Sequence, residues 1–149
     1  MRQLIGSGDK IGLLLLPFVV VGVVLNVVFP TWFEVGGPPE ALRTLSIAVL
    51  AVGVVIWLWT VVLILTTARR GELITTGPFL LVTHPLYVGV ALLVLPWLGF
   101  LLDTWLGVVL GAVLYVGRRE FAGEEEAELS ARFGDEWDEY RAGVLLPWL

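Results

Sequence analysis

Cysteine is absent from this sequence, and histidine and lysine each occur once, as His84 and Lys10. Without thiols the chain can form no disulfide, no thiolate metal site and no cysteine nucleophile. A single histidine also argues against a structural zinc site. We therefore expect a protein without a bound metal.

Charged residues are scarce too, at 15% of the 149 residues, whereas soluble domains carry about a quarter. Hydrophobic residues make up 58% of the chain and the mean hydropathy is +0.91. The net charge of -5 argues against nucleic-acid binding, which needs clustered lysine and arginine. This composition favours one small domain that resides in the lipid bilayer.

Four apolar runs can be tested against the bilayer, whose hydrocarbon core takes about 20 residues per spanning helix. The runs cover residues 11–29, 45–67, 86–102 and 104–116. The last two are short and are divided by Asp103, which predicts a tight helical hairpin that turns there. The sequence thus predicts an all-α integral membrane protein with about four transmembrane helices.

Lysine and arginine are distributed unevenly over the segments between these runs. With the N-terminus in the cytoplasm, every cation except Arg43 falls on the cytoplasmic side, where cations are normally enriched. They are Arg2, Lys10, Arg69, Arg70, Arg118, Arg119, Arg132 and Arg141. This count predicts cytoplasmic N- and C-termini. It places the loop after the second run and the tail, residues 117–149, on the same side of the membrane.

The tail predicts a cytoplasmic amphipathic helix. Leu129, Phe133, Trp137 and Tyr140 recur at spacings of four, four and three, which gives one apolar stripe. Gly134 would cost about 1 kcal/mol against alanine in a helix interior, so we expect a break or kink there. The stripe needs a partner that covers it.

The stretch from Gly77 to Tyr87 reads G-P-F-L-L-V-T-H-P-L-Y. Pro78 and Pro85 exclude a regular helix through all of it, because proline removes a backbone donor and clashes with the preceding turn. His84 can act as a base, an acid or a hydrogen-bonding anchor, since histidine gains and loses its charge near neutral pH. It can equally cap the third helix or bond a loop carbonyl.

Other residues of the loop and tail also have a purely structural interpretation. The helix dipole stabilises carboxylates in a first turn, arginines anchor the cytoplasmic surface, and tyrosine and tryptophan suit the membrane interface. The residues concerned are Glu124, Glu125, Glu126, Arg118, Arg119, Tyr87, Trp137 and Tyr140. Taken singly, none of them is specific for a function.

Taken together, the two segments resemble the isoprenylcysteine carboxyl methyltransferase and phospholipid methyltransferase superfamily. The stretch from Gly77 to Tyr87 is similar to the signature G-P-Y-x-x-V-R-H-P-x-Y, and residues 125–140 are similar to E-E-x-x-L followed by F-G-x-x-Y-x-x-Y. The resemblance covers roughly the C-terminal half of the chain. Thr83 stands where the family has arginine, and Trp137 replaces a tyrosine.

The resemblance implies a membrane enzyme that binds S-adenosylmethionine at the cytoplasmic face and methylates a carboxylate or amine of a lipid-like or isoprenoid-bearing acceptor. The cofactor contacts it implies come from Gly77, Pro78, Phe79, Val82, His84, Pro85, Tyr87, Glu125, Glu126, Trp137 and Tyr140. His84, Glu125 and Arg119 are the catalytic candidates. The arginines that could replace the one missing at Thr83 are Arg69, Arg70, Arg118 and Arg119.

Two other functions remain open. Membrane sterol or steroid reductases carry a related His-Pro-Asn-Tyr signature and use NADPH, although Leu86 stands at the asparagine position here. A non-catalytic membrane scaffold with a degenerate pocket is favoured by Thr83, Leu80 and Leu81, which depart from the methyltransferase pattern. Binding of S-adenosylmethionine distinguishes the methyltransferase from the scaffold, and a titration with the nicotinamide cofactor tests the reductase.

Overall fold

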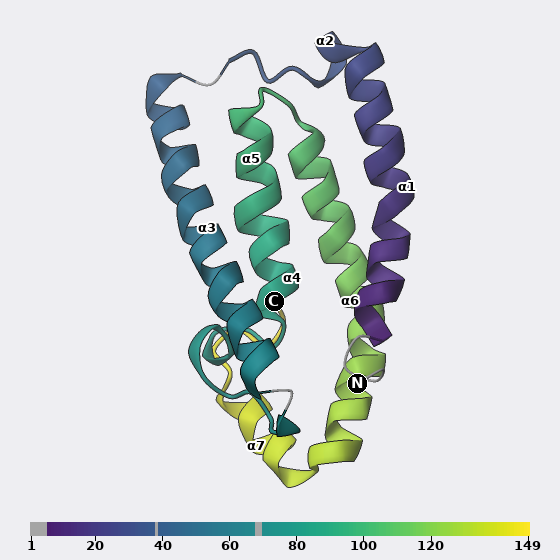
Figure 1. Cartoon of the computed structure of the whole chain (residues 1–149), viewed down its shortest axis with the longest axis vertical. Helices are drawn as coiled ribbons and strands as arrows, with labels where there is room; N and C mark the ends of the chain where they lie inside the picture. Colours follow the sequence, from purple (N-terminus) through teal and green to yellow (C-terminus); the bar gives the residue numbers. More distant parts are fainter. Residues whose placement is uncertain (1–5, 38, 68–69) are drawn as a thin grey trace.

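Four long helical segments stand side by side in one row (Figure 1). The structure, a computed structural model, describes residues 6–37, 39–67 and 70–149, and every regular element in those ranges is helical. α3 packs on the α4–α5 segment, α5 packs on α6, and α6 packs on α1. Arg2 and Arg69, which entered the charge count, lie outside the described residues.

The two edge helices of the row correspond to the first two apolar runs. α1 spans Gly6–Val28 and α3 spans Glu40–Thr67. Both are long and apolar enough to cross a bilayer, and they carry most of the large apolar side chains that the molecule exposes. Helices that are apolar all round and remain uncovered by protein suit a hydrocarbon environment. The predicted all-helical architecture is confirmed, with two helices of membrane-spanning length.

The third run is helical but not uniform. α4 (Pro85–Gly89) leads into the π-helical turn η3 (Val90–Val94), which continues as α5 (Leu95–Leu101). Pro96 stands in the first turn of α5, two residues after Val94, and lacks the backbone N–H of a regular helical turn. The segment therefore keeps its direction while its helical register shifts.

The chain reverses at Asp103, as predicted. Asp103 has a φ of 54°, in the left-handed region that residues other than glycine seldom adopt. Its carboxylate accepts hydrogen bonds from the backbone N–H groups of Val35 (3.2 Å) and Gly37 (2.9 Å). The hairpin turn is thereby tied to the loop between α3 and α2 (Pro30–Phe33), which lies at the same end of the row (Figure 1).

The fourth run is only the first part of a much longer helix. α6 extends from Leu106 to Phe133, so the tail does not start a separate helix after residue 117. Residues 117–132 lack proline and are rich in alanine, glutamate and arginine, which continue a helix readily even where it leaves an apolar environment. The break expected at Gly134 is confirmed: this glycine has a φ of 55° and separates α6 from α7 (Asp135–Gly143).

Glycines set the distance between α5 and α6. A Cβ at Gly107 would lie 2.1 Å from the carbonyl oxygen of Leu95 and 2.8 Å from the Cα of Gly99. A Cβ at Gly111 would lie 2.4 Å from the carbonyl oxygen of Ala91. Small residues four positions apart allow two apolar helices to approach closely. The hairpin therefore packs backbone against backbone, a contact that the sequence analysis did not predict.

Replacing Gly107 with alanine should destabilise the fold, because the added methyl group has no room. We expect a loss of about 1–3 kcal/mol in the free energy of unfolding. Gly12→Ala is the matched control, since a Cβ there meets no atom within 4 Å, and it should be neutral or slightly stabilising. Thermal unfolding in detergent, followed by circular dichroism, measures both variants. Equal unfolding midpoints would contradict the close α5–α6 contact.

Candidate functional site

A cavity of about 380 Å³ lies at the end of the row opposite α2. Its volume falls within the range of small-molecule sites, about 300–1,000 Å³. Its walls come from the last turns of α3, the loop that follows α3, the start of α4, the lower part of α6, and α7. These segments are far apart in the sequence and meet at the end of the molecule that carries α7 (Figure 1).

The cavity combines an apolar wall with a few polar side chains. α3 contributes Val61, Ile64 and Leu65 to the wall. The polar and ionisable residues that line it are Glu72, Thr83, His84, Tyr87, Glu125, Arg132 and Tyr140. An apolar enclosure with a small number of convergent polar groups is typical of a ligand pocket.

Most of the residues predicted to contact a cofactor are brought together here. Seven of the eleven line the cavity, so the loop and the tail face each other across one space; these are Phe79, His84, Pro85, Tyr87, Glu125, Trp137 and Tyr140. Gly77, Pro78 and Val82 belong to the same loop but not to the cavity wall. Glu126 also lies behind the wall, in contact with His84.

Glycine and proline shape the loop that carries His84. Gly77 has a φ of 64° and begins the 3₁₀ turn η2 (Gly77–Leu80), which has a proline in its first turn. Pro85 begins α4, at a position where a backbone N–H is not needed. Thr83 and His84, between these two turns, are buried. The side chain of His84 makes no capping hydrogen bond to α4, so helix capping does not account for it.

The apolar stripe predicted for the tail faces the cavity. Leu129 and Phe133 lie in α6, while Trp137 and Tyr140 lie in α7, and all four line the same space. The chain changes direction at Gly134, between the two pairs. Trp137 is 2% exposed and is the most deeply buried member of the stripe. The stripe thus forms one wall of the site.

Hydrogen bonds hold the tail against the loop. The Tyr140 hydroxyl donates to the carbonyl oxygen of Phe79 at 2.8 Å. Burial raises the pKa of Tyr140 to about 12, so the phenol remains a donor at neutral pH. Further along, the backbone N–H of Leu145 donates to the Leu80 carbonyl at 3.2 Å.

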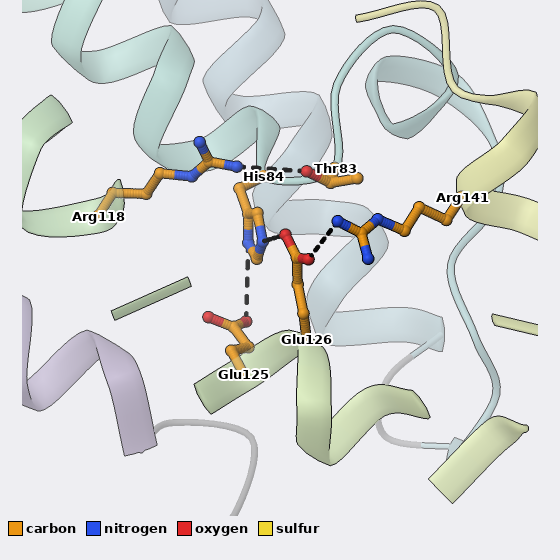
Figure 2. A network of polar contacts seen from close by, with 6 residues as sticks. All are labelled: Thr83, His84, Arg118, Glu125, Glu126 and Arg141. Carbon is orange, nitrogen blue, oxygen red and sulfur yellow. Dashed lines mark hydrogen bonds and ion pairs between the residues drawn. The ribbon is translucent and has the colours of Figure 1, made fainter. Parts of the chain in front are cut away.

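His84 lies between two carboxylates of α6 (Figure 2). Its Nδ1 is 3.9 Å from Glu125 Oε1, and its Nε2 is 3.8 Å from Glu126 Oε1. Both distances exceed hydrogen-bond length, so these contacts are electrostatic. The side chain is 5% exposed, and Nε2 has no hydrogen-bond partner among the described residues. A buried polar atom left unpaired is costly, and Nε2 lies on the side of Glu126, behind the cavity wall.

Glu126 connects His84 to the C-terminal helix. Its Oε2 accepts a hydrogen bond of 2.9 Å from the Arg141 guanidinium. The His84 imidazole, together with the positive charges of Arg141 and Arg118, holds the pKa of Glu126 below its ordinary value, against the opposing effect of burial. The carboxylate is therefore ionised at neutral pH and stabilises positive charge beside the cavity.

Arg118 reaches the His84 loop from α6 and is 4% exposed. Its Nη2 donates to Thr83 Oγ1 at 3.3 Å (Figure 2). Among the described residues no carboxylate lies within 4 Å of this guanidinium, and its Nε has no hydrogen-bond partner. Burial lowers the pKa of Arg118, while Glu126 and Glu125 oppose that effect, and an arginine in such surroundings stays charged.

Arg119, the arginine selected as a catalytic candidate, points elsewhere. It is exposed on α6, whereas the buried Arg118 contacts the loop at Thr83; neither arginine belongs to the cavity wall. Adjacent residues differ by about 100° around a helix, and the sequence alone did not say which of the pair faces the loop. The loop contact of Arg118 depends on how α6 packs against α1 and α5.

Several lining residues were missed by the sequence analysis. Val61, Ile64 and Leu65 carry no signal, because every position in their part of α3 is apolar. Arg132 entered only the count of cytoplasmic cations, but it lines the cavity next to Phe133. Its guanidinium carbon lies 5.1 Å from the centre of the Phe133 ring, over its face.

Comparison with known proteins adds no functional assignment. No protein-family model, no curated protein and no solved structure matches this chain. The functional argument therefore depends on the cavity and on the chemistry of the side chains around it.

The Glu126 network predicts a pH dependence of stability. Because its folded-state pKa lies below the ordinary value of 4.5, the ionised carboxylate stabilises the fold above about pH 4.5. That contribution is lost as the pH falls through the folded-state pKa. Glu126→Gln should therefore lower the unfolding midpoint at neutral pH and match the parent protein in strong acid.

Thermal unfolding from neutral pH down to about pH 3 provides the measurement. Glu128→Gln, at an exposed position of the same helix, serves as the control and should follow the parent protein throughout. A gap between the parent and Glu126→Gln that stays constant across this range would show that ionisation of Glu126 is not the cause.

Proposed function

We propose that this protein is a membrane methyltransferase that uses S-adenosylmethionine and acts on a lipid-like or isoprenoid-bearing acceptor. One observation supports the proposal above all. Residues of the loop from Gly77 to Tyr87 and of the tail from Glu125 to Tyr140, the two segments that resemble the family motifs, line one cavity of ligand size. The cavity also adjoins a helix long and apolar enough to cross the bilayer.

The proposal includes four membrane crossings with both termini in the cytoplasm. The apolar segment Pro85–Leu101 is 17 residues long, about 26 Å as a helix, and is slightly short for a crossing. It stands between α3 and α6 in the row and would share the thickness that they occupy. Arg43 lies near the α2 end of α3. The cations at the other end are Lys10, Arg70, Arg118, Arg119, Arg132 and Arg141.

When bound, S-adenosylmethionine supplies a methyl group whose bond to sulfur breaks as the acceptor's lone pair attacks in line, leaving a neutral thioether. The protein has to align the two reactants and exclude water. The apolar α3 wall suits a lipid-like acceptor, and the charged α6 side suits a polar donor from the cytoplasm. A site at the boundary between lipid and water is reached by both.

His84 and Glu125 hold the central positions in this scheme. Glu125 lines the cavity and can bind hydroxyl or amino groups through charge-assisted hydrogen bonds. If the acceptor is an amine, His84 or Glu125 must first remove its proton. If the acceptor is a carboxylate, it needs only desolvation and positioning.

Arg118 is our candidate for the guanidinium that the resemblance expects at Thr83. A hydroxyl cannot replace a planar cation with five donors. Arg118 brings such a cation into contact with the Thr83 hydroxyl, and Thr83 lines the cavity. We assign its guanidinium to the carboxylate of the bound cofactor, which it would reach past Thr83, because Arg118 itself is buried behind the cavity wall.

Calorimetric titration with S-adenosylhomocysteine tests the proposed function. The detergent-solubilised protein should bind it, and His84→Ala and Glu125→Ala should each weaken binding about tenfold or more, as expected for lost hydrogen bonds to charged groups. Glu136→Ala, exposed on α7, is the control. Unchanged affinity in both cavity variants would rule out this site. Absence of binding by the parent, combined with binding of NADPH, would favour the reductase alternative.

A second titration tests the role of Arg118. Arg118→Met should weaken S-adenosylhomocysteine about tenfold or more, because one charge-assisted hydrogen bond is lost. Binding of 5′-methylthioadenosine, which lacks the amino-acid carboxylate, should change less than about twofold by the same reasoning. An equal loss for both ligands would mean that Arg118 acts only by holding the loop through Thr83.

A further inference from the structure

Two segments without charged side chains pair with each other beside the cavity. Residues 73–83 contain no charged side chain, and neither do residues 142–149 at the end of the chain. The backbone N–H of Leu145 donates to the carbonyl of Leu80 at 3.2 Å, and that of Leu146 donates to Leu81 at 2.9 Å. Residues 77–81, which include the 3₁₀ turn η2, and residues 144–149 thus form one unit, the turn–tail element.

Gly77 fixes the position of this element along α3. A Cβ there would lie 3.1 Å from Leu63 Cδ1 and 3.1 Å from Trp59 Cε2. These residues precede the end of α3 at Thr67 by one to two turns, about 6–12 Å along the axis. The turn–tail element therefore lies beside the apolar part of α3 and not beyond its end.

The position of the chain end agrees with this depth. The tail returns from α7 toward the row, and the C-terminus lies near α4, well above α7 (Figure 1). The uncharged stretch 45–67 of α3 is about 34 Å long, close to the hydrocarbon thickness of about 30 Å. If that stretch spans the bilayer, the turn–tail element is level with acyl chains.

The side chains of the element are those of a lipid-facing surface. Leu80, Leu81, Leu145 and Trp148 are exposed by 54%, 50%, 68% and 64%. Such a cluster of large apolar side chains is unfavourable in water and marks a contact surface. Tryptophan is also enriched at the membrane interface.

Four carbonyls of the turn meet the condition for backbone groups in lipid, where polar groups must be paired within the protein. The carbonyls of Phe79, Leu80 and Leu81 accept hydrogen bonds from Tyr140, Leu145 and Leu146, and that of Pro78 accepts from Leu81 within the turn. Four consecutive carbonyls are thus satisfied without water.

We propose that the turn–tail element is re-entrant: it dips into the cytoplasmic leaflet, and its exposed leucines and tryptophan contact lipid acyl chains. The proposal depends on the membrane orientation given above but not on methyl transfer. If the proposal is right, the cytoplasmic part of the tail ends with α7, and residues 144–149 lie in the membrane. Since Phe79 also lines the cavity, the element forms a wall between the cavity and the lipid.

Site-directed spin labelling tests the depth directly, because the parent chain has no cysteine to remove. Leu81→Cys and Leu145→Cys place labels on the element at exposed positions. Val55→Cys, 61% exposed in the middle of α3, is the lipid control, and Glu136→Cys on α7 is the water control. In phosphatidylcholine nanodiscs, power saturation compares collisions with oxygen, which concentrates in lipid, and with a water-soluble nickel chelate.

Labels at positions 81 and 145 should favour oxygen over the nickel chelate, as the label at 55 does, with an accessibility ratio several-fold above that at 136. A ratio equal to that at 136, with 55 still in lipid, overturns the proposal. A water-like ratio at 55 as well would overturn it through its membrane premise. Titration with S-adenosylhomocysteine tests the proposed function separately.

A second measurement needs no spin label, so it tests the proposal even if a cysteine variant fails to fold. Brominated lipids quench tryptophan that lies among acyl chains, so the parent should lose more fluorescence than Trp148→Phe does. Identical quenching in the two proteins would place Trp148 outside the lipid and contradict the re-entrant element.

Discussion

The close contact between α5 and α6 is the constraint on which the site depends. Gly107 and Gly111 let the two helices approach so closely that a methyl group would collide with backbone carbonyls. His84 stands nineteen residues before the turn at Asp103, and Glu125 stands twenty-two residues after it. Because two helices in close contact rise at nearly the same rate from their shared turn, these residues arrive at the same level. A wider or slipped hairpin would separate the imidazole from its carboxylates.

The pattern of apolar residues was sufficient to predict which segments are helical. It did not predict which residues of one helix contact the next helix. The two long runs, the turn at Asp103 and the break at Gly134 follow from hydrophobicity, charge and glycine chemistry, which act locally. The apolar pattern did not predict that α6 continues past residue 116, because a change from apolar to charged sequence need not end a helix. Gly107 and Gly111 resemble every other glycine until the partner helix is known.

The same distinction applies to the candidate site. The two motif segments were identified from the sequence, and they do meet at one cavity. The choice between Arg118 and Arg119 required the rotation of α6 about its axis, which packing against α1 and α5 determines. The α3 wall required knowledge of which helix lies beside the loop. Residue chemistry therefore predicted the polar groups, whereas tertiary packing decided the apolar surroundings that make those groups effective.

Burial gives the charges around His84 their effect. Two glutamates and two arginines surround one imidazole, and the pairing is incomplete: Glu126 is bonded to Arg141, while Arg118 bonds only a hydroxyl among the described residues. In a site of low dielectric constant, unpaired donors interact strongly with a polar ligand that replaces water. If the turn–tail element lies in lipid, it keeps water away from one side of this cluster. In the proposed orientation the charged α6 side would face the cytoplasm, and the two sides of the cavity would differ in what they admit.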